Sequence, residues 1–168
     1  MNPGEWSRLD PPHWLVAWTG PQARADAWAD RAAPAAGPPA RLLRGAHTRT
    51  ARELFREFAH ALSFAKYHGR SWDGLSDCLE DLVWLGGKGL ILVVTGAGEL
   101  LADAPDADLE MLGDILLDAR DNWRHPVYER DLREDPQPFT VVLQDSESGL
   151  RSLASRAPSF QGLLEQLP

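Results

Sequence analysis

The stretch Gly89-Leu-Ile-Leu-Val-Val-Thr95 is an unbroken apolar run with the length of a β-strand. Such a strand is typical of a parallel sheet whose two faces are both covered. Residues 139–144, Phe-Thr-Val-Val-Leu-Gln, form another strong strand candidate, and residues 109–123 between them have the spacing of an amphipathic helix. The order strand, helix, strand favours a parallel α/β unit.

Upstream of this unit the sequence predicts one more strand and a helix. Residues 41–44, Arg-Leu-Leu-Arg, have the pattern of a short strand. Thr50 is placed to cap a helix that runs through Leu62, because Glu53 three residues later completes a capping box.

A second helix is expected to begin after Ser71 and to run to about Leu85, where Gly86-Gly87 would end it. Its apolar residues recur at helical spacing and form one stripe: Trp72, Leu75, Leu79 and Leu82. Together these elements predict an α/β fold with a small, mostly parallel three-stranded sheet packed with helices.

The first forty residues differ in composition from the rest and hold four of the seven tryptophans. Residues 15–18 predict a short strand and residues 23–33 a helix, before a proline-rich break. We expect this segment to dock on the main domain, because exposed indoles are costly. The expected division is an N-terminal extension (1–40), a main domain (41–145) and a tail with a short helix after Pro158 (146–168).

The net charge of −8 is unevenly distributed. Residues 73–118 carry eleven carboxylates and one base, a net charge of −10, whereas the rest of the chain sums to +2. A nucleic-acid-binding protein would instead concentrate Lys and Arg on one surface. We therefore expect neither nucleic acid nor an anionic membrane as a direct partner.

Targeting and cysteine content indicate the cytoplasm. The N-terminal residues show no secretory signal, and the longest apolar run is far shorter than the roughly 20 residues of a membrane span. Cys78 is the only cysteine, which excludes an intramolecular disulfide and fits a reducing compartment. Its position beside the apolar stripe predicts a buried thiol.

Enzyme signatures fail on inspection. Ser71 misses the nucleophile elbow because Asp73 stands where glycine is needed, and Gly96-Ala-Gly98 lacks the third glycine of a phosphate-binding turn. The histidines lack metal-ligand spacing. A divalent-metal site formed by Asp103, Asp106, Asp108 and Glu110 is a weak alternative, since the calcium-loop glycine is missing. We expect no enzyme activity, cofactor or metal.

Asp73, Asp77 and Asp81 recur every four residues, opposite the apolar stripe of the second predicted helix. Like charges at this spacing destabilise a helix by roughly 0.2–0.5 kcal/mol per pair. Two interpretations remain open here: a solvated acidic face, or a rigid row of negative charge for a cationic partner, with Tyr67 in the adjoining loop as an aromatic contact.

The run from Phe64 to Leu79, Phe-Ala-Lys-Tyr-His-Gly-Arg-Ser-Trp-Asp-Gly-Leu-Ser-Asp-Cys-Leu, strongly resembles the loop and acidic helix of the barstar family, intracellular inhibitors of the secreted bacterial ribonuclease barnase. The resemblance extends from about Arg41 to Asp145. It implies that carboxylates stand where RNA phosphates would lie and so plug the cationic active site of the enzyme.

The resemblance also implies roles for particular residues. Asp77 matches the central carboxylate, Asp73 its partner one turn earlier, and Asp118 falls near an additional acidic contact. The full set of expected partner-binding residues is Tyr67, Gly69, Trp72, Asp73, Asp77, Asp81 and Asp118.

Three positions depart from the family pattern: Ala65 replaces a proline, His68 a loop aromatic and Ser76 a tryptophan. These departures affect which enzyme is bound more than how it is inhibited. The expected partner is a secreted bacterial ribonuclease or a similar basic toxin, and the free protein is expected to be a monomer. The alternative is an immunity or interaction module of the same fold that binds a non-nuclease toxin or a regulatory partner.

Overall fold

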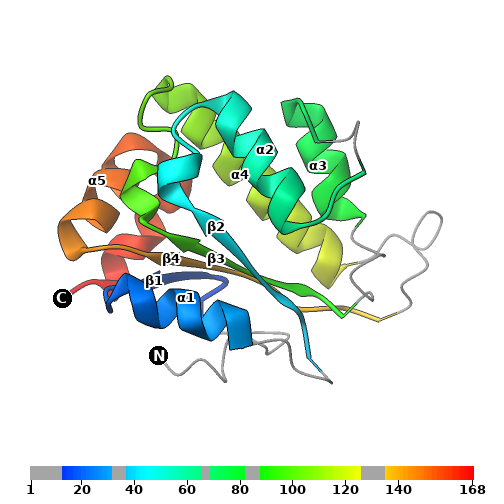
Figure 1. Cartoon of the computed structure of the whole chain (residues 1–168), viewed down its shortest axis with the longest axis horizontal. Coiled ribbons are helices and arrows are strands. Elements are labelled where there is room, and N and C mark those ends of the chain that lie inside the picture. The colour runs from blue at the N-terminus through cyan, green and yellow to red at the C-terminus, as the bar shows by residue number, and fades with distance from the viewer. Residues whose placement is uncertain (1–12, 32–36, 66–68, 82–87, 126–134) are drawn as a thin grey trace.

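The computed structural model describes residues 13–31, 37–65, 69–81, 88–125 and 135–168. Its centre is a four-stranded sheet in the order β1–β4–β3–β2, with every neighbouring pair parallel (Figure 1). The strands are β1 (Leu15–Trp18), β2 (Ala40–Arg44), β3 (Leu90–Thr95) and β4 (Phe139–Gln144).

The predicted α/β class with parallel pairing is confirmed, but the expected number of three strands is wrong. The additional strand is β1, which pairs with β4 so that Leu15 lies opposite Val141. β4 is buried at every position, and its outer edge would otherwise present unpaired backbone groups. The N-terminal strand therefore closes one edge of the main sheet.

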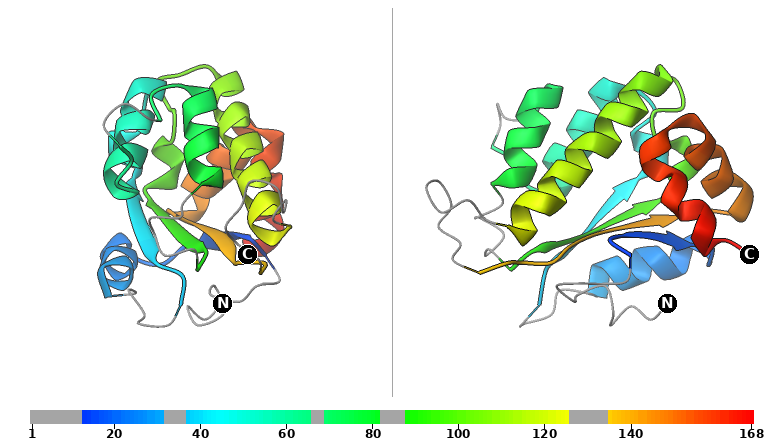
Figure 2. Two further views of the ribbon diagram at one scale, coloured as in Figure 1. Left: turned by 90° about the vertical axis from the view of Figure 1, so that its right-hand side faces the viewer. Right: turned by 180° about the vertical axis from the view of Figure 1, so that it is seen from behind.

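Helices cover both faces of the sheet (Figures 1 and 2). One face carries α1 (Gln22–Arg31), and the other carries α2 (Ala51–Ala61), α3 (Trp72–Glu80), α4 (Asp106–Arg124) and α5 (Glu147–Arg156). Three 3₁₀ segments complete the described elements: η2 (Gly45–His47), η4 (Ala97–Glu99) and η5 (Pro158–Gln166). Among the described residues, no helix is both long and apolar enough to cross a membrane.

The side chains of β3 point alternately to the two covered faces of the sheet, which explains why its sequence is apolar throughout. Ile91 and Val93 belong to a small core with Ala25 and Ala29 of α1. Leu92 and its alternate neighbours belong to the larger core under α2, α3, α4 and α5. Successive side chains of a strand point to opposite faces, so each residue of β3 is buried by a helix on one side or the other.

Both predicted N-caps are present. The Thr50 side chain accepts a hydrogen bond from the Glu53 N–H (3.3 Å), and a Glu53 carboxylate oxygen accepts one from the Thr50 N–H (3.0 Å), which is the predicted capping box. The Ser71 Oγ accepts a hydrogen bond from the Gly74 N–H (3.1 Å) and so begins α3.

The end of one helix and the presence of another differ from prediction. α3 ends at Glu80 rather than near Leu85, and Asp81 is its C-cap with non-helical φ −113° and ψ 75°. The predicted continuation to Leu82 and beyond lies outside the described residues. The tail contains α5, capped by Ser146, which was not predicted, in addition to η5 after Pro158.

Candidate protein interface

The turn that precedes α3 depends on Gly69. Its φ of +74° lies in the left-handed region, which glycine adopts without steric cost. A Cβ built there would lie 2.6 Å from Cδ2 of Phe64, whose ring is buried. Conformation and space therefore both require glycine at this position. Tyr67, the other predicted loop contact, lies outside the described residues.

One side of α3 is fixed by the core. Leu75 and Leu79 are fully buried, and Cys78 is 8% exposed. Trp72 is half-buried, and its ring meets Phe55 of α2 edge-on, with centroids 5.0 Å apart and planes at 80°. The predicted apolar stripe thus anchors the helix between α2 and α4 as far as Leu79.

The opposite side of α3 carries the acidic row, defined as Asp73, Asp77 and Asp81. All three side chains are exposed. Asp73 and Asp77 lie one helical turn apart, whereas Asp81 was predicted on the helix and instead lies just past its end. The row therefore consists of two helical carboxylates and one carboxylate at the C-cap.

The acidic row has no counter-charge within the described part of the chain, where none of its carboxylates accepts a hydrogen bond or forms an ion pair. Some carboxylates elsewhere are neutralised: the Arg49 guanidinium bonds both Asp103 and Glu99, and lowers the pKa of the Asp103 carboxyl through the hydrogen bonds it donates. The acidic row is therefore an uncompensated negative surface.

Asp118 lies on α4, which packs against α3. Its side chain is exposed, while the neighbouring Leu116 and Ala119 are buried. The structure thus brings Gly69, Trp72 and the acidic row onto one continuous segment and puts Asp118 on the adjoining helix.

Cys78 is a free, buried thiol, as expected. Burial raises its pKa above the ordinary value, and the negative charges of Asp77 and Asp81 raise it further. A nucleophilic cysteine needs a lowered pKa, so this thiol is suited to packing rather than chemistry.

The weak metal and phosphate alternatives meet structural obstacles. Asp103 and Asp106 are paired with Arg49 and Arg156. The Gly98 N–H, which a phosphate would need, donates instead to the Asp145 carboxylate (2.8 Å). Within the described ranges no group of three or more His, Cys, Asp or Glu could hold a metal ion.

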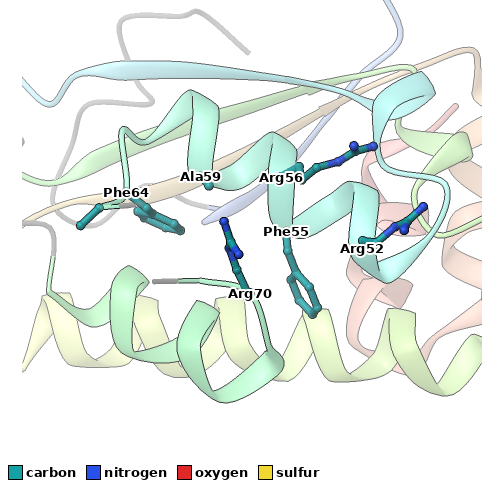
Figure 3. A pocket seen from close by; sticks show the side chains of 7 residues that line it. Arg52, Phe55, Arg56, Ala59, Phe64 and Arg70 are labelled. Atoms are coloured by element: carbon teal, nitrogen blue, oxygen red, sulfur yellow. The ribbon is translucent and has the colours of Figure 1, made fainter. Parts of the chain in front are cut away.

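One feature of this region was not predicted from the sequence. A cavity of about 510 Å³ lies between α2 and the segment before α3 (Figure 3). We call it the arginine pocket; its lining residues are Arg52, Phe55, Arg56, Ala59, Phe64, Ala65 and Arg70. The helical spacing of Arg52, Phe55, Arg56 and Ala59 was the available signal, but it does not reveal that Arg70 faces them.

The chain matches the model of a known protein family over more than half of its length. The family described as Barstar (barnase inhibitor) matches residues 39–144. Because this match covers more than half of the chain, the protein belongs to the barstar family. Comparisons with curated proteins and with solved structures give no significant match. The matched range runs from β2 to the end of β4 and leaves β1, α1, α5 and η5 outside it.

Proposed function

We propose that the protein inhibits a bacterial ribonuclease by inserting α3 and the preceding turn into the cationic active site of the enzyme. The observation that carries this proposal is the acidic row, which is exposed and has no counter-charge among the described residues. Membership of a family of barnase inhibitors supports it.

The packing of α3 would favour tight binding of the acidic row to its partner. The Ser71 cap fixes the start of the helix, and Leu75 and Leu79 hold its inner side in the core. Asp73 and Asp77 are therefore held in place before the partner arrives, and less conformational entropy is lost on binding than for a flexible loop.

The chemistry proposed is charge mimicry. A ribonuclease holds RNA phosphates with arginine, lysine and protonated histidine, and carboxylates on a rigid helix satisfy the same donors. Opposite electric fields would also accelerate encounter, an effect documented for barnase and barstar themselves. We assign the central contact to Asp77, with Asp73, Asp81, Gly69, Trp72, Tyr67 and Asp118 around it.

The biological setting follows from this chemistry. A cell that produces a secreted ribonuclease needs an inhibitor in the cytoplasm until export, and we propose that role for this protein, acting as a monomer without catalytic activity. Such an inhibitor binds the enzyme rather than RNA.

The experiment is a titration of the full chain against small secreted bacterial ribonucleases of the barnase class, with cleavage of a fluorescent RNA as the readout. The proposal predicts loss of cleavage at one inhibitor per enzyme, with an association rate that falls as salt rises. Failure to inhibit any such enzyme, together with purification of a basic partner that lacks ribonuclease activity, would favour a toxin of another kind.

A further inference from the structure

The arginine pocket gathers three positive charges in a protein of net charge −8. Arg52 and Arg56 come from successive turns of α2, and Arg70 extends from the segment before α3 into the space between the two helices (Figure 3). Phe55 and Phe64 supply an apolar wall. The pocket therefore combines cationic groups with aromatic surface.

The three arginines are not neutralised by the protein. Within the described ranges none of their guanidinium groups donates a hydrogen bond or forms an ion pair. By contrast, the side chains of Arg49, Arg151 and Arg156 each bond at least one carboxylate. An anionic group placed in the pocket would therefore meet cations that no carboxylate of the described residues already occupies.

The arginine pocket adjoins the acidic row. Arg70 follows Gly69 directly and stands three residues before Asp73. Phe55, in the wall of the pocket, contacts Trp72 in the first turn of α3. A protein that covers the start of α3 would therefore reach the pocket as well.

We propose that the arginine pocket receives an acidic side chain, with an apolar neighbour, from the protein partner that docks on α3. This inference rests on the proposed function, since it assigns a second contact to the same partner. RNA or another polyanion would be repelled by the adjacent acidic row, whereas a folded partner can present a basic site and an acidic rim together. Arginine and aromatic residues are also the types enriched at interface hot spots.

A partner-binding face of both signs would fix the orientation of the complex. The acidic row attracts a basic site in several registers, but only one register also seats a carboxylate in the arginine pocket. The pocket would thereby select among basic proteins, because those without a matching acidic side chain leave the arginines unpaired.

The test uses the free, ¹⁵N-labelled full chain, so that it does not depend on any ribonuclease. The probes are the peptide acetyl-Gly-Asp-Phe-Glu-Gly-amide and its uncharged counterpart acetyl-Gly-Asn-Phe-Gln-Gly-amide. The proposal predicts amide shifts in residues 52–59 and 69–70 with the acidic peptide, at least about tenfold weaker binding of the uncharged peptide, and loss of the shifts in the double variant Arg52→Glu, Arg56→Glu.

Arg24→Glu is the matched control, because Arg24 is an exposed arginine on α1, on the opposite face of the sheet. It should leave the peptide shifts unchanged. The proposal is overturned by absence of shifts, by equal binding of both peptides, or by shifts that persist in the double variant. Tighter binding of inorganic phosphate or AMP than of the acidic peptide also overturns it, since the site would then take small anions.

A second arm separates this inference from the proposed function. With a ribonuclease that the wild-type protein inhibits, the double variant should inhibit at least about tenfold more weakly than the Arg24→Glu control. Equal inhibition by the two would overturn the pocket assignment and leave the ribonuclease proposal intact. Peptide binding without inhibition of any ribonuclease would overturn the ribonuclease proposal and leave the pocket assignment intact.

Discussion

The indole Nε1–H of Trp123, near the end of α4, donates a hydrogen bond of 2.8 Å to the carbonyl oxygen of Leu79 in the last turn of α3. The last carbonyl groups of a helix receive no hydrogen bond from an N–H of the same helix. This bond therefore gives one of them a donor from a neighbouring helix. Because Trp123 is 1% exposed, the bond ties the end of α3, next to Asp77 and Asp81, to the core.

Trp123→Phe should therefore destabilise the protein and loosen the end of α3. The substitution keeps an aromatic ring but leaves the Leu79 carbonyl without its donor, which costs about 1–3 kcal/mol for a buried group. Urea unfolding measures the loss, and hydrogen exchange should show faster exchange of the Asp81 N–H, which bonds the Asp77 carbonyl.

Trp72→Phe is the control for this prediction, because no hydrogen bond of the Trp72 indole is present in the described structure. It should lose packing area without speeding exchange at Asp81. If both variants speed exchange at Asp81 equally, the hydrogen bond does not hold the end of α3.

Three glycine substitutions separate backbone strain from steric clash. Gly69→Ala would place a Cβ on a backbone with φ of +74° and against the Phe64 ring, so it combines strain with a clash. Gly96→Ala has only the strain of a φ of +63°, and Gly162→Ala has neither strain nor a clash. A left-handed φ costs about 1–2 kcal/mol for a residue with a Cβ. The free energy of unfolding should fall most for Gly69→Ala, less for Gly96→Ala and least for Gly162→Ala. Equal losses for all three would refute the role given to the Gly69 turn.

The Cys78 thiol should make stability decline at alkaline pH. Its folded-state pKa is raised above 9.0 by burial, so the folded protein holds this proton more tightly than the unfolded chain. The resulting stabilisation is complete below the unfolded pKa and is lost as pH rises through the folded pKa. The free energy of unfolding of Cys78→Ala should therefore fall less steeply above pH 9.0 than that of the wild type; parallel pH profiles would contradict the assignment.

Local signals in the sequence account for most of the fold. The apolar runs of β3 and β4, the capping box at Thr50 and the Ser71 cap each depend on residues close together in the chain, and each lies where it was predicted. The buried side of α3 follows from the same periodicity. Such features are set by backbone hydrogen bonding and by the face that becomes buried.

Features that depend on distant segments were not predictable in this way. The pairing of β1 with β4 joins residues more than a hundred positions apart, and periodicity does not specify a strand's neighbour. No glycine or proline marks the end of α3 at Glu80, so the predicted helix ran on to Gly86-Gly87. The arginine pocket likewise arises only when α2 and the Gly69 turn come together.

The most direct test of the central claim compares Asp77→Ala with Asp30→Ala in inhibition of a barnase-class ribonuclease. Both substitutions remove one exposed carboxylate, but Asp30 lies on α1, on the opposite face of the sheet. Loss of one partner of a buried charge pair in a complex costs about 2–5 kcal/mol. We predict that Asp77→Ala raises the inhibition constant about thirtyfold or more, while Asp30→Ala stays close to wild type. Equal inhibition by the two variants would contradict the claim that α3 occupies the active site.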